Sequence, residues 1–105
     1  MKDNVKSGAL TEVTFFILLA LYEPKHGYAI MQFIIEKTEG RLVLGAGSLY
    51  GAINTLLEKG WIEPHGDLDG RKKEYVITDE GRQIAEKELH RLRKLTETAA
   101  MIIEK

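Results

Sequence analysis

Apolar and polar positions follow helical spacing in the first half of the chain. Residues 13–22 are apolar almost throughout, which predicts a helix inside a core that ends before Pro24. Apolar side chains three and four apart predict a second helix over residues 28–38 and a third over residues 48–59. We expect Ser48 to be the N-cap of the third helix and Gly60 to supply its left-handed end.

Shorter patterns between these helices predict extended chain and turns. The pair at residues 26–27 is typical of a turn, and residues 42–44 are typical of a short strand before the third helix. Residues 61–63 and 74–78 indicate two more strands, and an Asp-Gly pair between them favours a hairpin.

The last quarter of the chain predicts one helix from Asp79 to the C-terminus, with acidic residues in its first turn. Its apolar residues recur at spacings of four and three, as in a coiled-coil seam. Such a helix is about 37 Å long, and its far end needs a second surface to cover it. We therefore expect a homodimer, with a seam formed by Leu89, Leu92, Leu95, Ala99, Ile102 and Ile103.

This order of elements predicts a mainly α fold with a small β-hairpin, a winged helix-turn-helix followed by a long C-terminal dimerisation helix. The chain would divide into a flexible N-terminal arm over residues 1–9, a winged-helix DNA-binding domain over residues 10–78 and the dimerisation helix over residues 79–105.

Three motifs resemble the PadR family of transcriptional regulators, in particular its small members with a short C-terminal helix. They are HGY at residues 26–28, GSLY at residues 47–50 and GRKKEYVIT at residues 70–78. The resemblance implies a homodimer built through the last helix and often the first, a third helix in the major groove and a wing against the minor-groove side or the backbone. It also implies repression of nearby genes and, in many members, release of DNA when a small molecule binds.

The chain departs from the family pattern at three places. Gly51 stands where a proline commonly follows the tyrosine, and Trp61 stands where an aliphatic residue is usual. The last helix lacks the tryptophans with which some small members bind flat drugs. The last departure argues against multidrug sensing.

The outer face of the third helix is small and polar, which suits close approach to base edges. Asn54 is expected to pair with adenine and Ser48 with either base. Tyr50 is expected to donate to a phosphate, the alternative being a half-buried ring against the second helix. The remaining DNA-contact residues are predicted to be Gly51 and Thr55 on this helix and Gly70, Arg71, Lys72 and Lys73 in the wing.

Charge leaves a second function open. The chain has 15 Lys and Arg residues against 16 Asp and Glu, a net charge of −1. DNA binding would therefore rest on locally placed cations rather than on a basic surface overall. The alternative is a winged-helix protein–protein interaction module without DNA binding.

Several other classes find no support in the sequence. Cysteine is absent, the three histidines lack metal-ligand spacing, and neither a nucleophile motif nor a phosphate loop is present. We expect no metal, no cofactor and no enzymatic activity. The apolar run is too short to span a bilayer, so we expect no membrane partner and a cytoplasmic location. A small hydrophobic or aromatic effector is expected in a pocket at the dimer seam, lined by Phe15, Phe16, Leu92 and Ala99.

Overall fold

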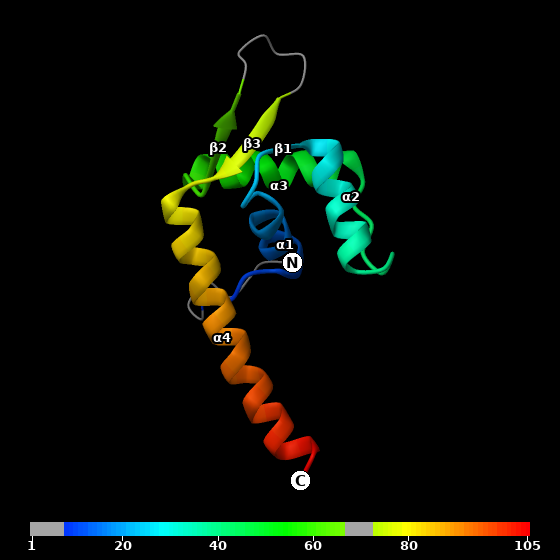
Figure 1. Ribbon diagram of the computed structural model, residues 1–105, viewed down its shortest axis with the longest axis vertical. Helices are drawn as coiled ribbons and strands as arrows, with labels where there is room; N and C mark the ends of the chain where they lie inside the picture. The colour runs from blue at the N-terminus through cyan, green and yellow to red at the C-terminus, as the bar shows by residue number, and fades with distance from the viewer. Residues whose placement is uncertain (1–7, 67–72) are drawn as a thin grey trace.

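The computed structural model describes residues 8–66 and 73–105. Within them lie α1 (Glu12–Ala20), β1 (Lys25–His26), α2 (Gly27–Lys37), α3 (Ala46–Lys59), β2 (Ile62–His65), β3 (Glu74–Ile77) and α4 (Asp79–Ile103). Helices α1 to α3 gather beside the sheet, β2 and β3 extend towards one end of the molecule, and α4 extends to the other (Figure 1). The predicted fold class, a winged helix-turn-helix with a long C-terminal helix, is confirmed.

The start of α3 differs from the prediction. Gly45 is its N-cap, with no side-chain capping bond, and the helix begins at Ala46. Ser48 therefore lies inside the first turn, and its prediction as N-cap is wrong. Extended backbone at Gly45 was enough to open the helix without a capping hydroxyl. The end was predicted correctly, because Gly60 adopts φ 77° in the left-handed region.

The sheet has a strand that the sequence pattern missed. Its order is β1-β3-β2, antiparallel throughout, with Lys25 opposite Tyr75 and Ile62 opposite Ile77. The pair at residues 25–26 is thus an edge strand, where a turn was expected at His26. Residues 42–44 form no strand among the described residues, since Leu42 and Leu44 pack on the core from a loop.

The core lies where α1, α2 and α3 meet the inner side of the sheet. Its members are apolar side chains at helical spacing in each helix, joined by residues that point inward from β2 and β3. They are Ile17, Leu18, Ala20, Leu21, Ile30, Ile34, Leu49, Ile53, Leu56, Ile62, Tyr75 and Ile77. Burial of each large side chain stabilises the fold by about 1.5–3 kcal/mol, so this core fixes the orientation of α3.

Helix α4 gives the molecule its elongated shape. The radius of gyration is 15.1 Å and the extents are 56 × 28 × 25 Å, whereas a compact chain of this length has a radius of gyration of about 13 Å. The fully buried residues of α4 are Gly81, Ala85 and Glu88, all in its first half. In the part of the chain that the structure describes, no helix is long and apolar enough to cross a membrane.

Candidate nucleic-acid interface

Helix α3 has one buried side and one exposed side. Leu49, Ile53 and Leu56 point into the core. Four of the predicted DNA-contact residues, Ser48, Gly51, Asn54 and Thr55, lie on the exposed side. The Thr55 hydroxyl donates to the Gly51 carbonyl at 3.2 Å, so its rotamer is held by the helix itself. The exposed side is therefore rich in short polar groups.

Tyr50 lies at the edge of this side, 44% exposed, with its ring against the start of α2. A Cβ at Gly27 would overlap Tyr50 Oη and lie 2.7 Å from Tyr50 Cζ. Packing against the second helix is therefore present, while the phosphate contact stays a prediction. Burial raises the pKa of the Tyr75 phenol, with a smaller contribution from Tyr50. The contact joins the HGY and GSLY motifs.

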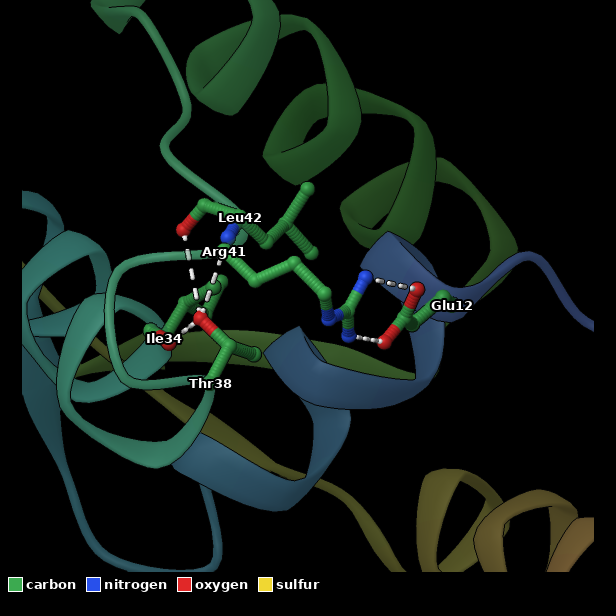
Figure 2. A network of polar contacts seen from close by, with 5 residues as sticks. All are labelled: Glu12, Ile34, Thr38, Arg41 and Leu42. Carbon is green, nitrogen blue, oxygen red and sulfur yellow. Dashed lines mark hydrogen bonds and ion pairs between the residues drawn. The ribbon is translucent and has the colours of Figure 1, made fainter.

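The loop between α2 and α3 is fixed by the Thr38 side chain (Figure 2). Its hydroxyl donates to the Ile34 carbonyl at 2.7 Å and accepts from the Leu42 amide at 3.1 Å. Arg41, in the same loop, pairs with Glu12 at the start of α1 (Figure 2). Because both side chains are exposed, this ion pair contributes little to the free energy of unfolding. Its main effect is to position the loop beside α1. The network sets where the chain enters α3.

The far end of α3 is tied to the start of α4. The Thr78 hydroxyl donates to the Gly60 carbonyl at 2.7 Å and accepts from the Gly81 amide at 3.0 Å, which makes Thr78 the N-cap of α4. The Thr78 amide donates to the Trp61 carbonyl at 3.0 Å. Gly81 lies so close to Trp61 that a Cβ would overlap its carbonyl oxygen.

Only part of the predicted wing contact can be placed. Gly70, Arg71 and Lys72 lie outside the described residues. Lys73 is exposed and directly precedes β3, whose register with β2 runs from the Glu74–His65 pair to the Ile77–Ile62 pair. The contact predicted between the wing and DNA therefore stays a prediction.

The predicted dimer seam lies at the other end of the molecule. Leu95, Ile102 and Ile103 are 53%, 68% and 78% exposed, and Leu89 is also exposed. The other two seam residues, Leu92 and Ala99, are half-buried. An exposed apolar stripe of this kind is compatible with the predicted seam, which stays a prediction.

In the first half of α4, the carboxylate of Glu88 is buried and forms an ion pair with Arg91. The Arg91 guanidinium donates to it at 2.9 and 2.6 Å, and the Leu10 amide also donates to it. The hydrogen bonds from Arg91 lower the pKa of Glu88, against the opposing effect of burial. This carboxylate fastens the segment before α1 to α4.

The four predicted effector residues, Phe15, Phe16, Leu92 and Ala99, are all half-buried. Phe16 packs against the core. None of the four lines the cleft of about 520 Å³ that the chain forms between residues 8–10, α3 and α4. The predicted pocket would need a second chain, so it stays a prediction.

Comparison with known proteins agrees with this architecture. The family model described as the transcriptional regulator PadR-like family matches residues 17–87. A transcriptional regulator from Clostridium thermocellum is 27% identical, with 100% of this chain and 99% of that chain covered and a TM-score of 0.75. Bacillus subtilis PadR in complex with operator DNA is 24% identical, with 74% and 46% covered and a TM-score of 0.64, a likeness of fold.

A curated relative is larger than this chain. An uncharacterized 37.1 kDa protein in a transposon of Streptomyces fradiae is 37% identical over 86 residues, 81% of this chain but 24% of that protein. The chain thus spans about a quarter of the relative's length. Since the family model covers 17–87, from α1 into α4, the chain belongs to the PadR-like family of transcriptional regulators.

Proposed function

We propose that this protein is a sequence-specific DNA-binding transcriptional regulator, a ligand-responsive repressor that acts as a homodimer on a pseudo-palindromic operator. The observation that carries the proposal is the two-sided α3. Its apolar side is held in the core by Leu49, Ile53 and Leu56, and its exposed side carries the short side chains of Ser48, Gly51, Asn54 and Thr55. A helix presented in this way fits a major groove without steric obstruction.

Each exposed residue has a chemical role in this proposal. Asn54 reads adenine through its amide, and Ser48 donates to or accepts from a base edge. Gly51 and Thr55 allow close approach of the helix backbone. Tyr50 keeps its ring against α2 while its exposed edge faces the DNA backbone, and Lys73 adds a cation beside the wing.

The dimer supplies the symmetry of the operator. Two α3 helices held by the α4 seam would enter successive major grooves about 34 Å apart. Repression follows when the dimer occupies a promoter. An effector releases it only if it binds one spacing of the two α3 helices more tightly than the other. The operator complex of Bacillus subtilis PadR, a protein of the same fold, supports the DNA partner.

A protein–protein interaction module is the second candidate, favoured by the net charge of −1. The two candidates differ in how they respond to salt. For a DNA binder, log K falls linearly with log salt concentration in proportion to the phosphates neutralised. A module shows no DNA affinity at any salt concentration.

The direct test is selection of genomic fragments by the purified protein, followed by sequencing. One enriched palindromic site upstream of a gene supports the regulator, and no enrichment at low salt contradicts it. Asn54→Ala is then compared with the wild type on operators changed one base pair at a time. We expect it to relax the preference at one position per half-site by about 1–3 kcal/mol. An unchanged preference at every position would refute the orientation of α3.

A further inference from the structure

Helix α2 begins with a histidine cap. His26 is its N-cap, and the Nδ1 of His26 accepts a hydrogen bond from the Ala29 amide at 3.4 Å. The imidazole is stacked on the ring of Tyr28, with ring centroids 6.5 Å apart and planes inclined by 18°. An imidazole nitrogen accepts only while it is unprotonated, so this cap requires a neutral ring. Protonation removes the acceptor and places a positive charge at the positive end of the helix dipole.

The sheet places a carboxylate across from this histidine. His26 of β1 is paired with Glu74 of β3, and His65 of β2 is paired with Glu74 from the other side. Paired residues of an antiparallel ladder lie on the same face of the sheet, with Cβ atoms about 4.5–5.5 Å apart. Glu74 Oε1 lies 3.8 Å from the position of a Cβ at Gly66, which follows β2. Rotation of the two side chains therefore suffices to bring the Glu74 carboxylate and the His26 ring together.

Other titratable side chains on the neighbouring elements are engaged or distant. Lys25 of β1 donates to the last carbonyl of α1 at 2.7 Å, and successive strand residues point to opposite faces of the sheet. Glu36 lines the same surface hollow as His26, but it lies about 15 Å further along α2. Tyr50 of α3 brings a phenol to the start of α2 rather than a carboxylate. Glu74 is thus the anionic group best placed to pair with a protonated His26.

We propose that His26 is a pH-sensitive switch with two alternative partners. When neutral, it caps α2 through the Ala29 amide; when protonated, it leaves the cap and pairs with the Glu74 carboxylate. Histidine is the residue type that changes its charge between pH 5 and 8, so mild acidification drives the exchange. The two partners oppose each other, because the cap favours the neutral ring and the carboxylate favours the charged ring. The switch therefore changes the position of the side chain more than the stability of the whole fold.

The capped end of α2 supports α3. Gly27 directly follows His26, and a Cβ at Gly27 would overlap the phenol oxygen of Tyr50. Loss of the cap releases the first turn of α2, against which the Tyr50 ring packs. Because Tyr50 is a proposed phosphate contact, an effect of pH on operator binding rests on the proposed function, whereas the exchange of partners does not. The first experiment therefore observes His26 in the absence of DNA.

The test is an NMR titration of the full chain between about pH 8 and pH 5. We expect the signals of the His26 ring and of the Ala29 amide proton to move with a single midpoint. Nuclear Overhauser contacts from the His26 ring to the Glu74 side chain should appear in acid. In His26→Asn, whose cap cannot be protonated, the Ala29 signal should stay constant. An Ala29 signal that does not follow His26, or that still titrates in His26→Asn, would overturn the switch.

Two further variants separate the partners. His65→Asn is the matched control, because His65 is exposed and is also paired with Glu74. It should leave the Ala29 transition unchanged, and loss of the transition would assign the switch to His65 instead. Glu74→Gln removes the charge that attracts the imidazolium, so the contacts between residues 26 and 74 should vanish. Contacts that persist in this variant would contradict the proposed pairing. Circular dichroism verifies that each variant is folded.

Operator binding is then measured by fluorescence anisotropy on the fragment that genomic selection recovers. From about pH 8 to pH 5, the ratio of the wild-type Kd to the His26→Asn Kd should rise about fivefold, as expected for loss of one helix cap. A constant ratio would overturn the link from His26 to the reading helix. If genomic selection recovers no fragment while Ala29 follows His26, the proposed function falls and the switch stands.

Discussion

Ile103 and Met101 provide a test of the dimer seam within a single turn of helix. Their side chains are 78% and 76% exposed in the single chain. Two residues along a helix are about 160° apart around its axis, so they face nearly opposite directions. Only Ile103 continues the stripe that contains Leu92 and Ala99. If the protein is a monomer, Ile103→Ser and Met101→Ser should have similar effects. If it dimerises through the seam, only Ile103→Ser should weaken the association of the two chains.

The expected size follows from the exposed area. Burying a whole isoleucine side chain stabilises by about 1.5–3 kcal/mol, so covering the exposed part of Ile103 contributes about 1–2 kcal/mol. An isologous dimer contains the residue twice, which gives about 2–4 kcal/mol. Ile103→Ser should therefore raise the dimer Kd about 30- to 1,000-fold. Met101→Ser should leave it within about threefold of wild type.

Sedimentation equilibrium over a range of protein concentrations measures both constants. The two residues are almost equally exposed, so only a position in the seam can make their effects on the dimer Kd differ. Equal effects of Ile103→Ser and Met101→Ser would therefore refute the seam. A wild-type chain that stays monomeric at every concentration would refute the dimer itself.

Three further predictions concern stability. Gly81→Ala should destabilise the fold by about 1–3 kcal/mol, because the new methyl group overlaps the rigid Trp61 carbonyl. Gly51→Ala meets open space in α3 and should instead stabilise by up to about 1 kcal/mol; urea unfolding measures both. Arg91 lowers the pKa of Glu88 from 4.5, so ionised Glu88 contributes stability above that pH, which is lost as the pH falls through its folded pKa. Glu88→Gln should therefore flatten the fall of the unfolding free energy below about pH 4.5, and acid titrations that keep the wild-type slope would contradict it.

Helices in which apolar residues recur at helical spacing over several turns were predictable from the sequence. The helices at 12–20, 27–37 and 79–103 follow from side chains that repeat within each segment, and Gly60 marks the end of α3 by its own backbone preference. The exposed side of α3 was predictable for the same reason, because the positions of its buried residues determine which residues face outward.

Features that depend on contact between distant segments were not predictable. Strand β1 is two residues long and forms because it pairs with β3. The residues around it carry no pattern that predicts this pairing. Ser48 was expected to cap α3 because it is a strong capping residue, yet Gly45 precedes the helix with suitable backbone angles. The cleft is lined by residues 8–10, Thr14, α3, Trp61 and α4, so no local spacing indicates it.

The joint at Trp61, Thr78 and Gly81 makes the two proposed ends of the molecule depend on each other. Two hydrogen bonds from Thr78 and the close contact at Gly81 prevent α4 from turning against the end of α3 unless they break. Over a helix of about 37 Å, a rotation of about 5° at this joint moves the far end by about 3 Å. In the proposed dimer the far ends are fixed to each other, so the same rotation must change the spacing of the α3 helices.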